Sequence, residues 1–247
     1  MKTRLDQLLV DRGLVESREK AKALILAGEV MVNGQKSGKA GQGVADHARV
    51  DLLARPKYVS RGGLKLEDAL AAFAIDVANK VCIDVGASTG GFTDCLLQHG
   101  ARKVYAFDVG TAQLDWKIRT DPRVVAREQF NCRNLSPADV GEPCDLAVCD
   151  VSFISVTLLL AGMKSVLREN GEMVILVKPQ FEAGRGEVGK GGIVRDPAVH
   201  VACCEKVERA VRELGFGVAI RESPILGAEG NKEFLLYACD SNRRINL

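Results

Sequence analysis

The sequence lacks any apolar segment long enough to span a membrane. The best candidates, residues 156–161 and 173–177, fall far short of the roughly 20 residues that such a helix needs. The N-terminal stretch MKTRLDQLLVDRG carries charges throughout and has no continuous apolar run, so it does not have the pattern of a secretory signal. We therefore expect a soluble cytoplasmic protein that does not act on a membrane.

The sequence also lacks the paired cysteines of a metal site. None of its 8 cysteines forms a C-x-x-C pair, and the chain has only 3 histidines. Several cysteines lie inside apolar, strand-like runs, where cysteine behaves as a small hydrophobic residue. We expect no metal site, no metal requirement for function, and a reducing compartment.

Charge is unevenly distributed along the chain. The overall net charge is only +2, but residues 1–65 hold 13 basic and 7 acidic residues, whereas residues 66–247 hold 21 and 25. A basic module that binds a polyanion, followed by a separate catalytic body, would explain this asymmetry.

Residues 1–54 show the pattern of a small α+β domain. The leucines of RLDQLLV lie on one face of a helix that Gly13 ends, and Ser17 caps a second helix that Gly28 ends. The segment VMVNGQ predicts two strands joined by an Asn-Gly turn, and ARVDLL predicts a closing strand. The polar face of the second helix carries three basic residues: Arg18, Lys20 and Lys22.

After an expected linker at residues 55–62, residues 63–247 show the alternation of an α/β domain. Seven strand-like runs are present: KVCIDVG, KVYAFDV, RVVARE, DLAVCDV, EMVILVK, GVAIRE and EFLLYAC. Helices are expected at 91–98, 111–119, 152–168, and from Pro197 behind the cap Asp196. This alternation predicts a doubly wound, mostly parallel, seven-stranded Rossmann-like sheet. The glycine-rich run at 182–192 is expected to form a mobile loop.

The stretch DVGASTGGF, residues 84–92, allows two interpretations. In the first, GASTG fits G-x-S-x-G, which would make Ser88 the nucleophile of a serine hydrolase. That enzyme needs a histidine that follows the catalytic acid in the chain. His99 comes too early, and His200 lies in an expected helix, so this interpretation is disfavoured.

The second interpretation is a glycine-rich loop for a nucleotide-like cofactor. The spacing departs from the dinucleotide pattern G-x-G-x-x-G, because Ser88 takes the place of the second glycine. The next strand ends in Asp108, 22 residues after Gly86, where an acid can accept hydrogen bonds from both hydroxyls of a ribose. An adenosine cofactor without a pyrophosphate fits this loop. The acids Asp84 and Asp108 suit the positive charges of S-adenosylmethionine.

The chain resembles known families in two regions. Its N-terminal segment is similar to the small RNA-binding module shared by a small-subunit ribosomal protein, tyrosyl-tRNA synthetase and many pseudouridine synthases. The match rests on RLD at 4–6, Ser17-Arg18, Ala21, Gly28 and VNG at 32–34. Two basic helices on a small sheet would bind RNA phosphates.

From Met1 to about Asp240, the chain resembles the TlyA family of rRNA methyltransferases, which have an FtsJ-like catalytic part and were once called haemolysins. The shared motifs are YVSRGGLKL, DVGASTGGFTDCLL, CDVSFIS, VKPQFE and GNKEFLLY. The resemblance implies 2′-O-methylation of a ribose in ribosomal RNA. S-adenosylmethionine would be the methyl donor, and rRNA or a ribosomal subunit would be the partner.

The resemblance also implies a catalytic tetrad, which maps onto Lys65, Asp150, Lys178 and Glu233. Asp150 and Lys178 follow two expected parallel strands, at the sheet edge where ligands bind. A lysine can take the proton of a ribose hydroxyl only in its neutral form, which a second lysine nearby favours by repulsion. We assign Lys178 as general base, Lys65 as the nearby cation and the two acids as orienting groups; the lysines could exchange roles.

The remaining assignments concern the cofactor and RNA. The expected cofactor-binding residues are Asp84, Gly86, Ser88, Gly90, Gly91, Phe92 and Asp108. The expected RNA-binding residues are Arg4, Arg18, Lys20, Lys22, Arg61, Arg133, Arg185 and Lys190. Phe153 is expected in the core, with a position beside the site as the less favoured alternative.

Two other function classes remain open on the sequence. A non-catalytic ribosome assembly factor would retain the basic module but would not need the tetrad together with Asp108. A pore former, suggested by the haemolysin name of the family, would need a membrane-spanning segment.

Overall fold

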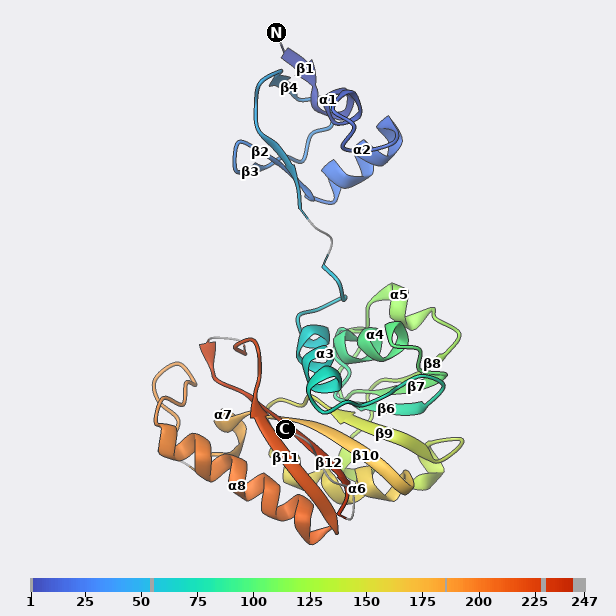
Figure 1. Ribbon diagram of the computed structural model, residues 1–247, viewed down its shortest axis with the longest axis vertical. Helices are drawn as coiled ribbons and strands as arrows, with labels where there is room; N and C mark the ends of the chain where they lie inside the picture. Colours follow the sequence, from blue (N-terminus) through green and yellow to red (C-terminus); the bar gives the residue numbers. More distant parts are fainter. Residues whose placement is uncertain (1, 54–55, 185, 228–229, 242–247) are drawn as a thin grey trace. The chain divides into compact units, whose positions relative to one another are not determined.

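The computed structural model describes residues 2–53, 56–184, 186–227 and 230–241. The chain forms two compact units, residues 1–56 and 57–247 (Figure 1). The start of the second unit differs from the expected boundary, because residues of the expected linker pack onto it. The Tyr58 side chain is buried, and the Val59 amide donates a hydrogen bond of 2.9 Å to Asp94 Oδ2. The expected boundary positions 54 and 55 lie outside the described residues.

The first unit contains the helices α1 (Leu5–Asp11) and α2 (Arg18–Leu26). Its strands are β1 (Lys2–Arg4), β2 (Val30–Val32), β3 (Gln35–Lys36), β4 (Gly43–Ala45) and β5 (Val50–Leu52). β2 pairs antiparallel with β3 and β5, and β1 pairs antiparallel with β4. The pairing of β1 with β4 has no counterpart in the sequence prediction.

Local sequence signals explain the expected part of this unit. The Ser17 hydroxyl accepts a hydrogen bond from the Lys20 amide and so caps α2. Asn33 and Gly34 have φ angles of +50° and +80°, which is the geometry of a tight hairpin turn between β2 and β3. The apolar faces of both helices meet in one core, whose buried members include Leu5, Leu9 and Ile25. The small α+β domain is therefore confirmed.

The second unit is built on a seven-stranded sheet, as predicted. Its strands are β6 (Val81–Val85), β7 (Lys103–Phe107), β8 (Val124–Arg127), β9 (Cys144–Cys149), β10 (Leu167–Val177), β11 (Phe216–Glu222) and β12 (Phe234–Asp240). The order across the sheet is β11-β12-β10-β9-β6-β7-β8. Only β12 runs against its neighbours, β10 and β11; the other described pairings are parallel.

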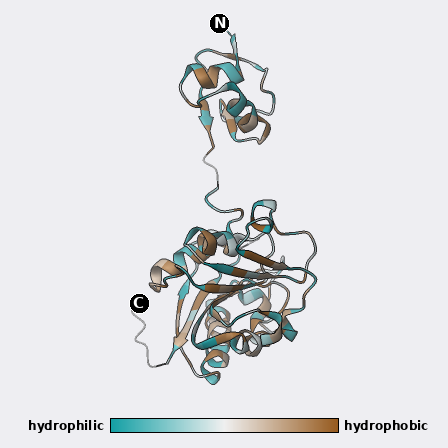
Figure 2. Ribbon diagram, turned by 90° about the vertical axis from the view of Figure 1, so that its right-hand side faces the viewer, coloured by the Kyte–Doolittle hydropathy of each residue, from teal (hydrophilic) through white to brown (hydrophobic). Residues whose placement is uncertain are grey.

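Helices cover both faces of this sheet (Figure 1). Its described helices are α3 (Gly62–Ala72), α4 (Gly91–Gln98), α5 (Trp116–Arg119), α6 (Leu160–Ser165), α7 (Pro179–Glu182) and α8 (Pro197–Glu213). Short 3-10 turns occur at Cys132–Asn134, Pro137–Asp139 and Val156–Leu158. α3 and α4 pack into the core on one face, and α6 and α8 pack into the core on the other. The strands between them are largely coloured as hydrophobic in Figure 2. The doubly wound α/β fold is confirmed.

Two expected helices are shorter than predicted. In place of 111–119, α5 covers only Trp116–Arg119, because Ala112 has a φ of +53° and Asp115 caps the helix start. In place of 152–168, a 3-10 turn and α6 occupy the middle, and β10 already begins at Leu167. The helix from Pro197 is confirmed, with Asp196 capping the Ala198 amide. No helix in the described ranges is long and apolar enough to cross a membrane.

Candidate active site

Two adjoining cavities lie at the carboxyl edge of the parallel strands. The tetrad cavity, whose wall contains Lys65, Asp150, Lys178 and Glu233, has a volume of about 480 Å³. The Asp108 cavity, whose wall contains Asp108 and residues 130–133, has a volume of about 530 Å³. Their shared lining residues are Gly86, Ser88, Asp150, Ser152 and Phe153. A ligand in one cavity can therefore reach a ligand in the other.

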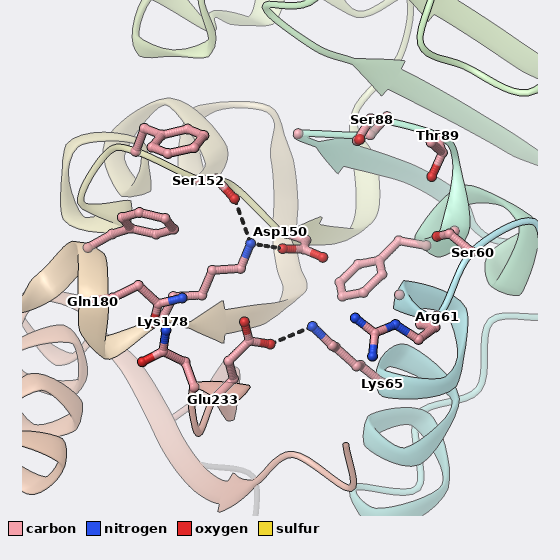
Figure 3. A pocket seen from close by; sticks show the side chains of 18 of the residues that line it. Ser60, Arg61, Lys65, Ser88, Thr89, Asp150, Ser152, Lys178, Gln180 and Glu233 are labelled. Atoms are coloured by element: carbon pink, nitrogen blue, oxygen red, sulfur yellow. Dashed lines mark hydrogen bonds and ion pairs between the residues drawn. The ribbon is translucent and has the colours of Figure 1, made fainter. Parts of the chain in front are cut away.

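Lys178 and Asp150 form one ion pair of the tetrad cavity. They directly follow β10 and β9, which are adjacent and parallel, so both side chains begin at the same edge of the sheet. Lys178 Nζ lies 2.6 Å from Asp150 Oδ1 and donates a hydrogen bond of 2.9 Å to Ser152 Oγ (Figure 3). The Lys178 side chain is only 11% exposed. Its ammonium is therefore fixed between two oxygens and largely removed from bulk water.

Lys65 and Glu233 form the second ion pair. Lys65 lies in the first turns of α3, and Glu233 immediately precedes β12. Lys65 Nζ donates to Glu233 Oε2, and both side chains are buried (Figure 3). Gly227 leaves room for this carboxylate, because a β-carbon at that position would overlap Glu233 Oε1. The four residues that the sequence motifs selected thus come together, and their formal charges cancel.

The glycine-rich loop after β6 lies between the two cavities and α3. Gly86 has a φ of +86°, and a β-carbon there would lie 2.7 Å from the backbone carbonyl oxygen of Asp150. A β-carbon at Gly91 would overlap Ser60 Oγ, and one at Gly90 would lie 2.9 Å from Leu114 Cδ1. These glycines therefore allow close packing of the protein around the loop, rather than only close approach of a ligand.

Asp108 lies at the end of β7, in the wall of the Asp108 cavity. Its Oδ2 accepts a hydrogen bond of 2.8 Å from the Ser88 amide, and its Oδ1 accepts one of 2.6 Å from the Gly110 amide. Each carboxylate oxygen has a second lone pair, so both can still accept a hydrogen bond from a ligand hydroxyl. The two backbone bonds fix the carboxylate in place for that purpose.

Asp84 lies beneath the loop, and it is fully buried. Thr93 Oγ1 donates a hydrogen bond of 2.7 Å to Asp84 Oδ2. Burial, with a smaller contribution from the nearby Asp150 charge, raises the pKa of Asp84 to about 7, although the Thr93 bond opposes the shift. Asp84 was expected to contact the cofactor. It does not belong to the lining of either cavity, and its hydrogen bond from Thr93 joins β6 to α4.

The other expected cofactor residues divide between the cavities. Gly86 and Ser88 line both, Asp108 lines the Asp108 cavity, and Gly91 and Phe92 line the tetrad cavity, whereas Gly90 lines neither. The sequence analysis missed further lining residues: Ser60, Ser152, Gln180, Phe181, Asn131 and Asn231. Ser152 and Phe181 could have been found, because they lie inside the motifs CDVSF and VKPQFE that supplied the tetrad.

The prediction that Phe153 belongs to the core is wrong. Its side chain is 92% exposed, and its φ of +65° turns the chain outward after Asp150. It lines both cavities and lies beside Phe181, with ring centroids 5.2 Å apart. The residue type favoured burial, but the left-handed backbone at this position prevents it.

Basic residues border both cavities. Arg61 is exposed and lines the tetrad cavity, where Figure 3 shows its guanidinium beside Lys65. Arg133 is also exposed, but it lines the Asp108 cavity, on the side where the cofactor is expected. Lys190 is exposed, and Arg185 lies outside the described residues. The expected loop begins later than predicted, because Glu182 belongs to α7 and is buried.

In the first unit, the buried carboxylate of Asp6 joins two of the expected RNA-binding residues. Arg4 and Arg18 approach Asp6 Oδ2 at 3.1 Å and 2.9 Å, while their own side chains remain about half exposed, at 55% and 44%. Lys20 pairs with Glu16 at 3.1 Å on the exposed surface, and Lys22 is exposed. Two guanidinium groups are therefore held side by side.

The hydrolase interpretation finds no support in the geometry. Ser88 does have the strained backbone of a nucleophile elbow, with a φ of +47°. However, neither His99 nor His200 lines a cavity; His200 is buried and its Nε2 lies 3.0 Å from the Val194 carbonyl oxygen. Among the described residues, no group of three or more His, Cys, Asp or Glu side chains could hold a metal ion.

Comparison with known proteins identifies both units. Residues 58–239 match the FtsJ-like methyltransferase family, and residues 3–50 match the S4 domain. The chain is 44% identical over 239 residues to the 16S/23S rRNA (cytidine-2′-O)-methyltransferase TlyA of Mycobacterium tuberculosis, which covers 96% of this chain and 89% of the relative. It is 45% identical over 236 residues to hemolysin A of Brachyspira hyodysenteriae, covering 95% of this chain and 98% of the relative.

A solved structure agrees with these matches. A Streptococcus thermophilus protein with a hemolysin name superposes with a TM-score of 0.75 at 46% identity, covering 99% of this chain and 90% of that chain. The matches extend across both units, and the motifs that carry the tetrad lie inside the matched region. The chain belongs to the TlyA family of FtsJ-like methyltransferases, with an S4 domain at its N-terminal end.

Proposed function

We propose that the protein methylates the 2′-hydroxyl of a ribose in ribosomal RNA, with S-adenosylmethionine as methyl donor. One observation carries the proposal: two lysine–carboxylate pairs face one cavity, which adjoins a second cavity with a fixed acid at its wall. The name of the M. tuberculosis relative specifies 2′-O-methylation of cytidines in 16S and 23S rRNA, which supports the same reaction type here.

The Asp108 cavity suits S-adenosylmethionine. Asp108 presents two oriented oxygens to a ribose, Phe130 and Leu159 supply apolar surface for a base, and Ser88 and Asp150 lie where the cavities adjoin. When bound, S-adenosylmethionine supplies a methyl group made electrophilic by its sulfonium. The residues that would hold it are those of the Asp108 cavity, with Arg133 at its border.

The tetrad supplies the proton chemistry. Lys178 in its neutral form accepts the proton of the ribose hydroxyl, because a neutral hydroxyl is a weak nucleophile. Asp150, 2.6 Å away, stabilises the ammonium that forms. Glu233 pairs with Lys65 and holds its side chain in the wall of the same cavity as Lys178. Both lysine side chains are about 10% exposed, so water screens these interactions weakly.

The S4 domain would anchor the RNA. Its Arg4–Asp6–Arg18 cluster and the exposed Lys22 provide cations for phosphates, and Arg61 places another cation at the mouth of the tetrad cavity. The substrate is rRNA, either free or within a ribosomal subunit, and such a substrate would place the protein in the cytoplasm.

The proposal is tested by incubating the purified protein with methyl-labelled S-adenosylmethionine and with each ribosomal subunit, intact ribosomes or free rRNA. Mass spectrometry of the digested RNA should find a 2′-O-methylated nucleoside. Asp150→Asn should reduce the transfer by about 100-fold or more. Asp145→Asn is a control, because Asp145 lies in β9, the strand that Asp150 follows, but pairs with Arg168 and lines neither cavity.

The outcome also separates the competing functions. RNA binding without transfer to any of these substrates would favour a non-catalytic assembly factor. Leakage of lipid vesicles on addition of the protein would favour a pore former. Transfer to a base rather than to a ribose would contradict the reaction that we propose.

A further inference from the structure

Glu182 is a buried carboxylate close to the tetrad, but it is not part of it. It ends α7, four residues after Lys178, and its side chain is only 2% exposed. A charged group that is removed from water in this way is costly unless several donors satisfy it. Its partners therefore indicate why the carboxylate is there.

Three donors from two distant segments converge on Glu182. The Val156 amide donates to Oε1 at 2.7 Å, and the Ser155 hydroxyl donates to Oε2 at 2.6 Å. Lys206 Nζ, from α8, donates to Oε2 at 2.9 Å and also to the Glu182 carbonyl oxygen at 2.9 Å. The first two donors lie in the segment 151–157 that follows Asp150.

The carboxylate therefore joins the two chain segments that carry the Lys178–Asp150 pair. β9 and β10 stay in register up to Cys149 and Ile175, and the chain leaves the sheet just beyond these residues. Beyond that point, no described pairing of strands fixes one segment against the other. Glu182, which follows Lys178 in the chain, connects the two segments again through hydrogen bonds from Ser155 and Val156, which follow Asp150.

The segment after Asp150 needs such a connection. Phe153 has a φ of +65°, which is an unfavourable conformation for an aromatic residue. Ser152, which receives the Lys178 hydrogen bond at 2.9 Å, is exposed and lies next to it. Relaxation of this strained turn would move Ser152 away from the Lys178 ammonium.

We propose that Glu182 is a positioning residue, which braces the segment 151–157 against α7 and so sets the geometry of the Lys178–Asp150–Ser152 contacts. The inference rests on the methyl transfer proposed above. It assigns Glu182 no contact with RNA or with the cofactor, since it lines neither cavity.

A second buried acid, Glu172, controls for the effect that removal of any buried charge has on the stability of this unit. Glu172 is also a buried acid that follows β9 in the sequence; it lies in β10, six residues before Lys178, and pairs with Lys80 at 2.7 Å. It does not line a cavity either. Glu182→Gln and Glu172→Gln each remove one buried charge from the same unit, but only the first removes the brace.

Hydrogen–deuterium exchange of the full chain tests the brace without reference to activity. Glu182→Gln should speed exchange in peptides covering 151–158 by about 10-fold, whereas Glu172→Gln should leave these peptides at the wild-type rate. Unchanged exchange in 151–158 for Glu182→Gln, or equal acceleration in both variants, would overturn the proposal.

Single-turnover methyl transfer tests the consequence. Glu182→Gln should lower the rate at saturating substrates by about 10- to 100-fold, with dissociation constants for S-adenosylmethionine and RNA within about twofold of the wild type. In a double variant with Ser152→Ala, the rate loss should be smaller than the product of the losses measured for the two single variants, because both changes act on the same contact. A rate loss in the double variant equal to that product, or an equally large rate loss in Glu172→Gln, would contradict the positioning role.

A second variant covers the case in which Glu182→Gln does not fold. Ser155→Ala removes one donor to the carboxylate, together with the Ser155 contacts to Thr157, and keeps the Val156 and Lys206 contacts. It should speed exchange in 151–158 and slow transfer by a few-fold, and wild-type behaviour in both would contradict the brace. If the wild type itself transfers no methyl group, the proposed function fails, while the exchange experiment still decides whether the brace exists.

Discussion

The backbone carbonyl oxygen of Asp150 lies 2.7 Å from the position that a β-carbon on Gly86 would occupy. The loop that follows β6 and the catalytic acid that follows β9 are therefore in direct contact. Because this contact leaves no room for a side chain, the loop and the tetrad are built as one structure.

Substitution at Gly86 should lower the free energy of unfolding by much more than its positive φ alone implies. Gly86→Ala must both adopt a φ of +86° and displace Asp150. Gly100→Ala is a matched control, because Gly100 has the same φ of +86° but its nearest neighbour would lie at 3.6 Å. We expect a loss of about 1 kcal/mol of unfolding free energy for Gly100→Ala and about 2 kcal/mol more for Gly86→Ala, measured by urea denaturation. Equal losses would show that the contact with Asp150 does not matter.

The buried Asp84 should make stability depend on pH. Its pKa is raised by burial to about 7 in the folded protein, against about 4 in the unfolded chain. The folded state therefore binds the proton more tightly, so this contribution to stability is complete below about pH 4 and is lost as the pH rises to about 7.

Asp84→Asn removes this titration while keeping a similar side-chain shape. The unfolding free energy of the wild type, relative to Asp84→Asn, should fall by about 2 to 3 kcal/mol between pH 5 and pH 8. Urea denaturation across that range measures the difference. Parallel pH profiles for the two proteins would show that Asp84 titrates normally in the fold.

Asp6 should strengthen RNA binding although it is an acid. Hydrogen bonds from Arg4, and then from Arg18, hold its pKa well below the usual range, so it stays charged and keeps both guanidinium groups in place. Asp6→Asn removes one negative charge, which by charge alone should tighten binding to RNA. We expect the loss of preorganisation of the two arginines to outweigh this charge effect, so binding should weaken by about 3- to 10-fold.

Asp46→Asn is the control for the change in charge. Asp46 is an exposed acid of the same unit that accepts a hydrogen bond from Thr3. It should leave RNA affinity unchanged or slightly increased in filter binding at fixed salt. Tighter binding by Asp6→Asn than by the wild type would show that the carboxylate merely offsets positive charge.

Much of this architecture could be predicted from the sequence, because the signals are local. Each of the seven strands of the second unit contains a short apolar run, and Asp150 and Lys178 directly follow β9 and β10. In a parallel sheet, the residues after neighbouring strands meet at one edge, so the tetrad could be assembled from motifs alone. The cap Ser17 and the Asn33-Gly34 turn are likewise short-range features.

The features that the sequence did not predict depend on backbone angles and on distant partners. Phe153 looked like a core residue, but its positive φ, unusual for an aromatic residue, directs it outward. Glu182 looked like the first residue of a glycine-rich loop. Its donors Ser155 and Lys206 lie 27 and 24 residues away, so nothing near it in the sequence indicated that it is buried.

The general-base role of Lys178 is the central claim, and one measurement tests it most directly. Ribose methylation is mapped across the rRNA of cells that lack the gene and carry wild type, Lys178→Met or Lys164→Met. Lys164 is a suitable control because its Nζ donates to the Leu214 carbonyl oxygen at 2.8 Å and lines neither cavity. We predict that at least one 2′-O-methyl group disappears without the gene. Wild type and Lys164→Met should restore it, and Lys178→Met should not. Restoration by Lys178→Met at the wild-type level would contradict the account.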